Sequence, residues 1–173
     1  MYSLNSFSVI STLRVLSYYC ASLPDGSVTV IVSTASPHIR LYDSAGVQKW
    51  ESTGGGLTIS WGVCHVPDIN AVAVCDYDNK RVQLMSSRLA DGRHIRTIGA
   101  GHFSSFVFSI AYDAAAKVLV VGEFDNVSAW TLEGQLVHEW GKGAVNAACG
   151  VAIDPCDNTI YVSDRNSSRI LVY

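Results

Sequence analysis

Two Asp–Arg pairs are the most regular polar feature of the sequence. Asp76 precedes Arg81 by five residues, and Asp164 precedes Arg169 by the same spacing. Such a pair can contact a ligand, or it can fix a turn, with the carboxylate accepting backbone N–H bonds and pairing with the arginine across a hairpin. We favour the structural interpretation, because a device that repeats along a chain is typical of architecture.

Histidines are the next candidates for chemistry, since an imidazole can bind a metal ion or move a proton at neutral pH. No two of the five have the spacing of metal ligands; they are His38, His65, His94, His102 and His138. His65 lies between Cys64 and Val66, where a hydrogen-bonded core histidine is the expected role. The sequence therefore predicts no metal site and no cofactor.

Nucleophile and phosphate-binding motifs are missing from the sequence as well. There is no G-x-S-x-G, and the run Gly54–Gly56 leads into Leu57–Ile59, which is typical of a strand rather than of a helix that opens with lysine. The five cysteines are odd in number and form no C-x-x-C pair, so free thiols in a reducing compartment explain them most simply. We predict a cytoplasmic protein that is not an enzyme and has no catalytic residues.

The amino-acid composition further narrows the class of protein to which the chain can belong. Apolar residues make up 49% of the 173 residues and charged residues 16%, so the chain can bury a core and is not disordered. No apolar stretch approaches the roughly 18 residues that span a membrane, and residues 1–16 lack the pattern of a signal peptide. The formal net charge of −3 gives no overall attraction to nucleic acid or to an anionic membrane.

The elements that must position these residues follow from an internal repeat. The segment 62–68 (GVCHVPD) matches 150–156 (GVAIDPC), and without a gap Asp76 then falls on Asp164 and Arg81 on Arg169. Two further copies fit before and between them, so copies begin near residues 19, 62, 109 and 150. We predict a single domain, residues 1–173. The four copies of the repeat begin near residue 19, and residues 1–18 precede the first copy.

Each copy has the pattern of four short strands. Apolar runs alternate with turns rich in Pro, Asp, Asn and Gly, and no window has a helical period. Four strands in roughly 43 residues, covered on both faces, are the signature of a propeller blade. We predict an all-β fold, a β-propeller of about four four-stranded antiparallel blades. The residues expected to be buried are Val63, Val74, Val82, Ile110, Val120, Val151, Ile160, Val162 and Ile170.

The last copy, GVAIDPCDNTIYVSDRNSSRILVY, resembles the NHL-repeat consensus. The copy from Gly62 matches it nearly as well, whereas the third has Glu123 and Ser128 in place of the Asp and Arg, and the first is the most degenerate. The resemblance implies a propeller that acts as a non-catalytic protein-binding scaffold. Relatives with lyase or hydrolase activity hold a metal at the channel, and of such ligands only Asp113 and Asp154 share one repeat position, where a turn-forming role is favoured.

The sequence is compatible with more than one arrangement of the two ends of the ring. The last copy ends at Tyr173 after its third strand, and residues 1–18 contain a candidate closing strand, Phe7–Thr12, which would pair beside Arg169–Tyr173. The alternatives are a ring closed in this way, an arc completed by self-association, and a segment of a longer propeller. An uncovered strand edge is an aggregation hazard in each open form.

One face of the ring is predicted to bind the partner. In an antiparallel blade, the turns between the second and third strands lie at the same end as the links that lead to the next blade. That face carries aromatic, amide and basic side chains, and loop-bearing faces commonly bind partners. The predicted binding residues are Tyr77, Asn79, Lys80, His102, Phe124, Asn126, Arg165 and Asn166. Binding of single-stranded RNA is the alternative, since a basic run extends from Lys80 to Arg96. A channel-centred metal-dependent lyase or hydrolase is the third.

Overall fold

The computed structural model describes residues 19–32, 38–52, 56–88 and 92–173, and this part of the chain is built from antiparallel strands. The only helical segments in these ranges are two single 3₁₀ turns, η1 (Pro67–Ile69) and η2 (Arg165–Ser167). The strands are β1 (Cys20–Ser22), β2 (Val28–Val32), β3 (His38–Tyr42), β4 (Gln48–Ser52), β5 (Ser60–Val66), β6 (Ala71–Asp76), β7 (Arg81–Ser86), β8 (His94–Ile98), β9 (Val107–Asp113), β10 (Val118–Glu123), β11 (Val127–Thr131), β12 (Leu136–Trp140), β13 (Ala148–Ile153), β14 (Ile160–Asp164) and β15 (Arg169–Val172).

The strands form four sheets in chain order, one for each copy of the repeat. Sheet one is β1–β4, sheet two β5–β8, sheet three β9–β12, and sheet four the three strands β13–β15. Every strand pairs only with its neighbours in sequence, as expected when short turns join successive strands. The predicted copy starts at 62, 109 and 150 fall within β5, β9 and β13, and the start near 19 lies one residue before β1.

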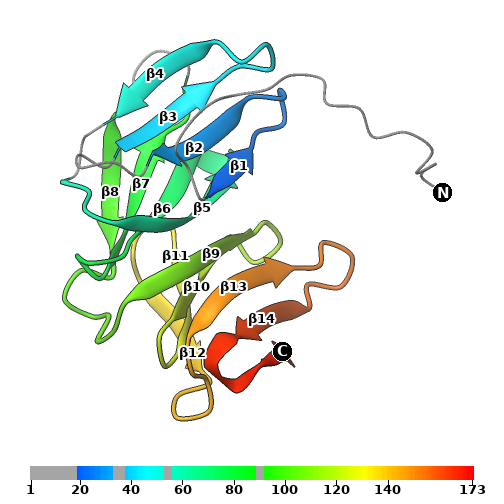
Figure 1. Cartoon of the computed structure of the whole chain (residues 1–173). Coiled ribbons are helices and arrows are strands. Elements are labelled where there is room, and N and C mark those ends of the chain that lie inside the picture. Colours follow the sequence, from blue (N-terminus) through cyan, green and yellow to red (C-terminus); the bar gives the residue numbers. More distant parts are fainter. Residues whose placement is uncertain (1–18, 33–37, 53–55, 89–91) are drawn as a thin grey trace.

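The four sheets stack face to face in a row (Figure 1), and the first strands of consecutive sheets lie side by side. A separate apolar core fills each of the three spaces between sheets. Ile39 of sheet one and Val72 of sheet two belong to one core, for example, and Val82 of sheet two and Leu119 of sheet three belong to the next. Because sheets two and three are covered on both faces, their strands need near-continuous apolar runs, which explains the sequence pattern there.

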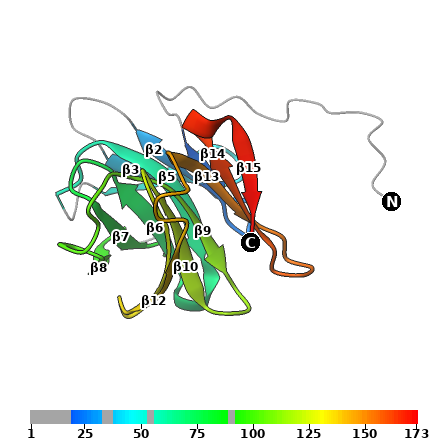
Figure 2. The ribbon, with the colours of Figure 1, turned by 90° about the horizontal axis from the view of Figure 1, so that it is seen from below.

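This stacking fits the blades of a β-propeller, with sheet four at one end of the row (Figure 2). Among the described residues, the packing of β9 on β13 has no counterpart between β13 and β1. The predicted closing strand Phe7–Thr12 falls outside the described residues. No helix in the described ranges is long and apolar enough to cross a membrane.

Most of the residues that the repeat pattern predicts to be buried are buried in the inner sheets, but not all of those in sheet four at the end of the row are. Five of the nine residues expected in the core are buried, and Val63, Val151 and Ile160 are half-buried. The prediction for Ile170 is wrong, since 60% of this residue is exposed. Its equivalent in sheet two, Val82, is fully buried because sheet three packs on it, whereas no described residue packs on the outer face of sheet four.

Candidate functional site

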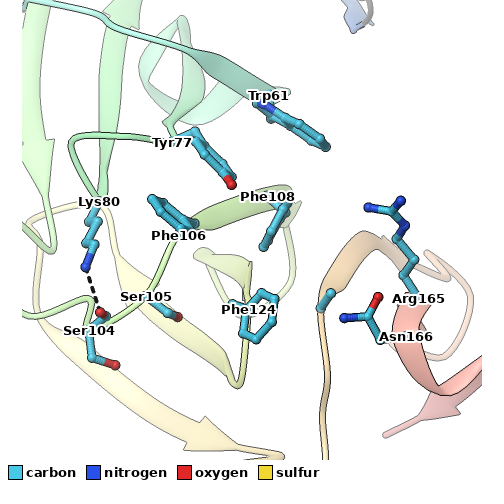
Figure 3. A pocket seen from close by; sticks show the side chains of 11 residues that line it. Trp61, Tyr77, Lys80, Ser104, Ser105, Phe106, Phe108, Phe124, Arg165 and Asn166 are labelled. Carbon is cyan, nitrogen blue, oxygen red and sulfur yellow. Dashed lines mark hydrogen bonds between the residues drawn. The ribbon is translucent and has the colours of Figure 1, made fainter.

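A cavity of about 450 Å³ opens on the face of the row that carries the β6–β7 turn and the links between sheets. Five aromatic rings from sheets two and three form its floor and walls; they are Trp61, Tyr77, Phe106, Phe108 and Phe124. Lys80, Ser104, Ser105, Ala147, Arg165 and Asn166 complete the lining. We call this site the aromatic pocket (Figure 3).

The hairpin topology brings these residues together from distant parts of the sequence. Tyr77 and Lys80 belong to the β6–β7 turn, and Phe124 belongs to the β10–β11 turn. Trp61 lies at the start of β5, the innermost strand of sheet two, and Phe108 lies at the start of β9 in sheet three. Each of these points is at the same end of its sheet, so stacking two sheets places all of them on one face.

The rings pack against one another in a continuous cluster. Tyr77 stacks between Trp61 and Phe106, with ring centroids 5.4 and 4.4 Å away, and Phe108 presents its edge to Tyr77 at 5.2 Å. These offset and edge-on arrangements are the favourable geometries of aromatic pairs. Phe106 and Phe124 remain 38% and 41% exposed, so the cluster presents apolar surface to a ligand.

Two cations lie on opposite sides of the rings (Figure 3). The Lys80 ammonium group donates to the Ser104 carbonyl at 2.9 Å and lies 5.6 Å from the centre of the Phe106 ring, a cation–π contact. Arg165 bonds to the side chain of Cys149, and its charge opposes the rise that burial causes in the pKa of that thiol. Neither cation forms an ion pair with a carboxylate in the described ranges.

Five of the eight predicted binding residues line the aromatic pocket: Tyr77, Lys80, Phe124, Arg165 and Asn166. The other three do not converge there. The Asn79 amide donates to the carboxylate of Asp76, and the buried Asn126 donates to Glu139 at 3.0 Å. His102 lies 3.3 Å from that same Glu139 carboxylate.

Sequence reasoning missed Trp61, Phe106 and Phe108, which make up most of the pocket floor. The positions of two of them in the repeat could have indicated their role. Trp61 directly precedes the first residue of one repeat copy, and Phe108 directly precedes the first residue of the next copy, Ser109. An aromatic side chain at one repeat position in adjacent sheets places two rings side by side on the same face.

The Asp–Arg pairs lie beside the pocket and serve the turns. Asp76 is fully buried and accepts hydrogen bonds from the Arg81 guanidinium at 2.8 Å, from Asn79, and from the backbone and hydroxyl of Thr58. The turn therefore satisfies this carboxylate without a ligand.

Asp164 has the same arrangement in sheet four, with Arg169 at 2.9 Å and the backbone N–H of Asn146 at 2.8 Å. Burial alone would raise its pKa, but these donors together with Ser167 hold the pKa of Asp164 below its ordinary value. Asp164 is therefore ionised at neutral pH and fixes its turn as a charged group.

Sheet three departs from this arrangement. Its β10–β11 turn is two residues shorter, because the backbone of Glu123 bonds to Asn126 where Asp76 faces Arg81 in sheet two. In the described ranges no arginine pairs with Glu123, which accepts a hydrogen bond from the Ser128 hydroxyl at 2.8 Å. Burial raises the pKa of Glu123 to about 7, and the nearby carboxylates of Asp125 and Glu139 add to the rise.

The residues considered for metal chemistry are scattered. In the described ranges no three His, Cys, Asp or Glu side chains are grouped so that they could hold a metal ion. Asp113 accepts the backbone N–H groups of Ala115 and Ala116, and Asp154 accepts that of Cys156, so both carboxylates fix tight turns.

Comparison with known families gives one match. The model of the NHL repeat matches residues 150–173, which are strands β13–β15 of sheet four. The chain therefore carries an NHL repeat at this end, and sheets one to three repeat the architecture of the matched segment with a fourth strand added. No curated protein matches the chain.

Proposed function

We propose that this protein is a non-catalytic NHL-type scaffold that binds another protein through the aromatic pocket. The observation that carries the proposal is the convergence of five aromatic rings from two sheets on one cavity, with a cation on either side. Aromatic and arginine side chains are the residues that most often dominate the energy of protein interfaces. NHL repeats commonly mediate such contacts.

The partner is proposed to insert a large apolar side chain beside a carboxylate. Burying the exposed parts of Phe106 and Phe124 would contribute roughly 25 cal/mol for each Å² of apolar surface removed from water. Lys80 and Arg165 are placed to meet an acidic group next to that side chain. The carboxylate of Asp125, an acidic group of the chain near the pocket, already accepts a hydrogen bond from the Ser105 hydroxyl at 2.8 Å.

Burial makes the thiols of Cys64 and Cys75 poor nucleophiles, which supports a non-catalytic role. Desolvation raises the pKa of Cys64 to about 12 and also raises the pKa of Cys75 well above its ordinary value, so both are protonated at neutral pH. All five cysteines are free, as suits the reducing cytoplasm in which we propose that the protein acts.

The test uses binding of peptides selected from a random display library on the intact chain. We expect enrichment of sequences with an aromatic or large aliphatic residue next to Asp or Glu. Phe124→Ala should weaken the selected peptides by about tenfold or more, because it removes one wall of the pocket. Leu136→Ala is the matched control, since Leu136 is exposed to a similar extent on β12, away from the pocket. Equal binding by both variants would contradict the proposal.

Single-stranded RNA is the second candidate, favoured by the stack of Trp61, Tyr77 and Phe106. Successive bases can stack on such a platform, and Lys80 and Arg165 could contact phosphates. A uridine oligonucleotide distinguishes the two, because RNA affinity should fall steeply as salt rises. Salt-sensitive binding that Phe106→Ala abolishes would favour RNA, whereas displacement of peptides only by acidic aromatic competitors favours a protein partner.

A further inference from the structure

Sheet four exposes the face that every other sheet uses to contact the next one. Four positions of sheet two are fully buried against sheet three; they are Ala73, Cys75, Val82 and Leu84. The equivalent positions of sheet four, 88 residues later, are Tyr161, Ser163, Ile170 and Val172. Ile170 and Val172 are each 60% exposed, although their equivalents are 0% exposed. For Ile170 and Val172 the difference lies in what covers the sheet, since Val82 and Leu84 are equally apolar.

The edge of this sheet is open as well. Tyr173 and Ile160 exchange both backbone hydrogen bonds, at 2.9 and 3.0 Å. Hydrogen bonding alternates along an antiparallel pair, so the backbone groups of Ile170 and Val172 point away from β14. In sheets one to three the corresponding strand is paired on both sides by a fourth strand.

A cavity of about 470 Å³ marks the place where the next sheet would enter. Arg165, Ser168 and Ile170 are among its lining residues, and the first two are the equivalents of Tyr77 and Lys80. In sheet two those two residues hold the link that leads into the next sheet. Lys80 donates to the Ser104 carbonyl and Tyr77 stacks on Phe106. The cavity is therefore the unfilled counterpart of an established contact.

Sheet one has the second face on which no other described sheet packs. Its face toward sheet two carries Ile39 and Leu41, both fully buried. The opposite face carries Val28, the buried side chains of His38 and Tyr42, and the half-buried ion pair of Arg40 with Glu51, 2.7 Å apart; no other described sheet packs on it. Three inter-sheet cores lie within the described part of the chain, and these two faces take part in none of them.

We infer that a second copy of this chain docks sheet one on the exposed face of sheet four. Within one chain the described β1 and β13 do not pack as β9 and β13 do, so a copy's own sheet one does not cover its sheet four. In a stacked repeat protein each unit binds its neighbour through the same pair of surfaces, and a head-to-tail contact between copies continues that series. The contact buries Ile170 and Val172.

The test is the mass of the intact chain in solution, measured by light scattering and sedimentation across a range of concentrations. We expect assemblies of at least twice the chain mass of 18.6 kDa. Ile170→Lys should raise the dissociation constant by about tenfold or more, because it places a charge in an apolar interface. The matched control is Val137→Lys, at a site on β12 that is similarly exposed, and it should leave assembly unchanged.

Mixing two variants tests the head-to-tail geometry. Val28→Lys blocks the sheet-one face, with Arg40→Glu as the substitute if the first variant does not fold by circular dichroism. Each blocked variant alone should fail to form long assemblies, and a mixture with Ile170→Lys should form a dimer through the one intact interface. A wild-type chain that is monomeric at all concentrations overturns the inference. A monomer that becomes an oligomer after deletion of residues 1–18 overturns it too, and assigns the face to that segment.

Discussion

Sheets two and three place a carboxylate at the same point of the repeat and surround it differently. In sheet two Asp76 meets an arginine, an asparagine and a threonine, and all of these contacts are within the turn or the link before β5. In sheet three Glu123 is equally buried but meets Ser128, whose hydroxyl also accepts a hydrogen bond from Trp130 at 2.8 Å.

The difference is that an arginine pairs with the buried carboxylate in sheet two, whereas a serine hydroxyl takes that place in sheet three. Shortening the turn by two residues leaves Asn126 opposite Glu123, and Asn126 bonds elsewhere. A buried carboxyl without a cation is held more easily in its neutral form, and its pKa therefore rises. The same repeat position thus holds an arginine-paired carboxylate in one sheet and a carboxyl group whose pKa is raised to about 7 in the next.

The largest expected effect is on Asp76→Ala. The substitution removes the acceptor of several hydrogen bonds and leaves Arg81 without its charged partner in a partly buried site, so we expect a loss of about 2–4 kcal/mol in the free energy of unfolding. Denaturant unfolding at pH 7 measures it. Asp78→Ala, at an exposed position of the same turn, is the control and should change stability little. Equal losses of unfolding free energy in the two variants would contradict the special role of the Asp76 carboxylate.

Asp164→Ala should have a smaller effect, about 1–2 kcal/mol. The carboxylate is as buried as Asp76, but the side chain of its partner Arg169 is 47% exposed and can be hydrated once the carboxylate is removed. The same unfolding assay applies. A loss larger than that of Asp76→Ala would show that exposure of the arginine does not set the size of the effect.

Glu123→Gln should remove a pH dependence of about 1 kcal/mol or more. The folded-state pKa is raised from 4.5 to about 7, so the stabilising contribution is fully present below pH 4.5 and is lost as pH rises through 7. The wild type should therefore lose stability between pH 5 and pH 8, and the variant should lose less. A wild-type stability that rises over this interval with no difference in Glu123→Gln contradicts a raised pKa.

The smallest effect is expected for His102→Ala. His102 and Glu139 form an exposed pair 3.3 Å apart, and such pairs contribute about 0–1 kcal/mol. Its position outside the aromatic pocket also predicts unchanged peptide affinity. A loss of affinity comparable to that of Phe124→Ala would move the binding site toward β12.

The sequence pattern predicted the strands well, because turn chemistry and apolar runs are local properties. The Pro67-Asp68 turn and the matching turn at Pro155 separate first and second strands as expected. The exposure of Ile170 was not predictable in this way, since its burial depends on whether another sheet packs on it. An apolar side chain looks the same in a sequence whether its face is covered or open.

The pocket was predicted in part for a related reason. Counting strands assigns Tyr77 and Phe124 to one face, because turns at one end of a sheet share that face. The same reasoning placed Asn126 there, although it is buried and bonded to Glu139. Aligning the copies by sequence conceals the two-residue shortening of this turn, which only the strand register shows.

The central claim is that the aromatic pocket carries binding while the Asp–Arg turns carry stability. The most direct test measures peptide affinity and melting temperature together for Phe124→Ala and Asp164→Ala. We expect Phe124→Ala to bind about tenfold more weakly with its melting temperature unchanged, and Asp164→Ala to melt several degrees lower with its affinity unchanged. An Asp164→Ala variant that keeps its melting temperature but loses the peptide would contradict the claim.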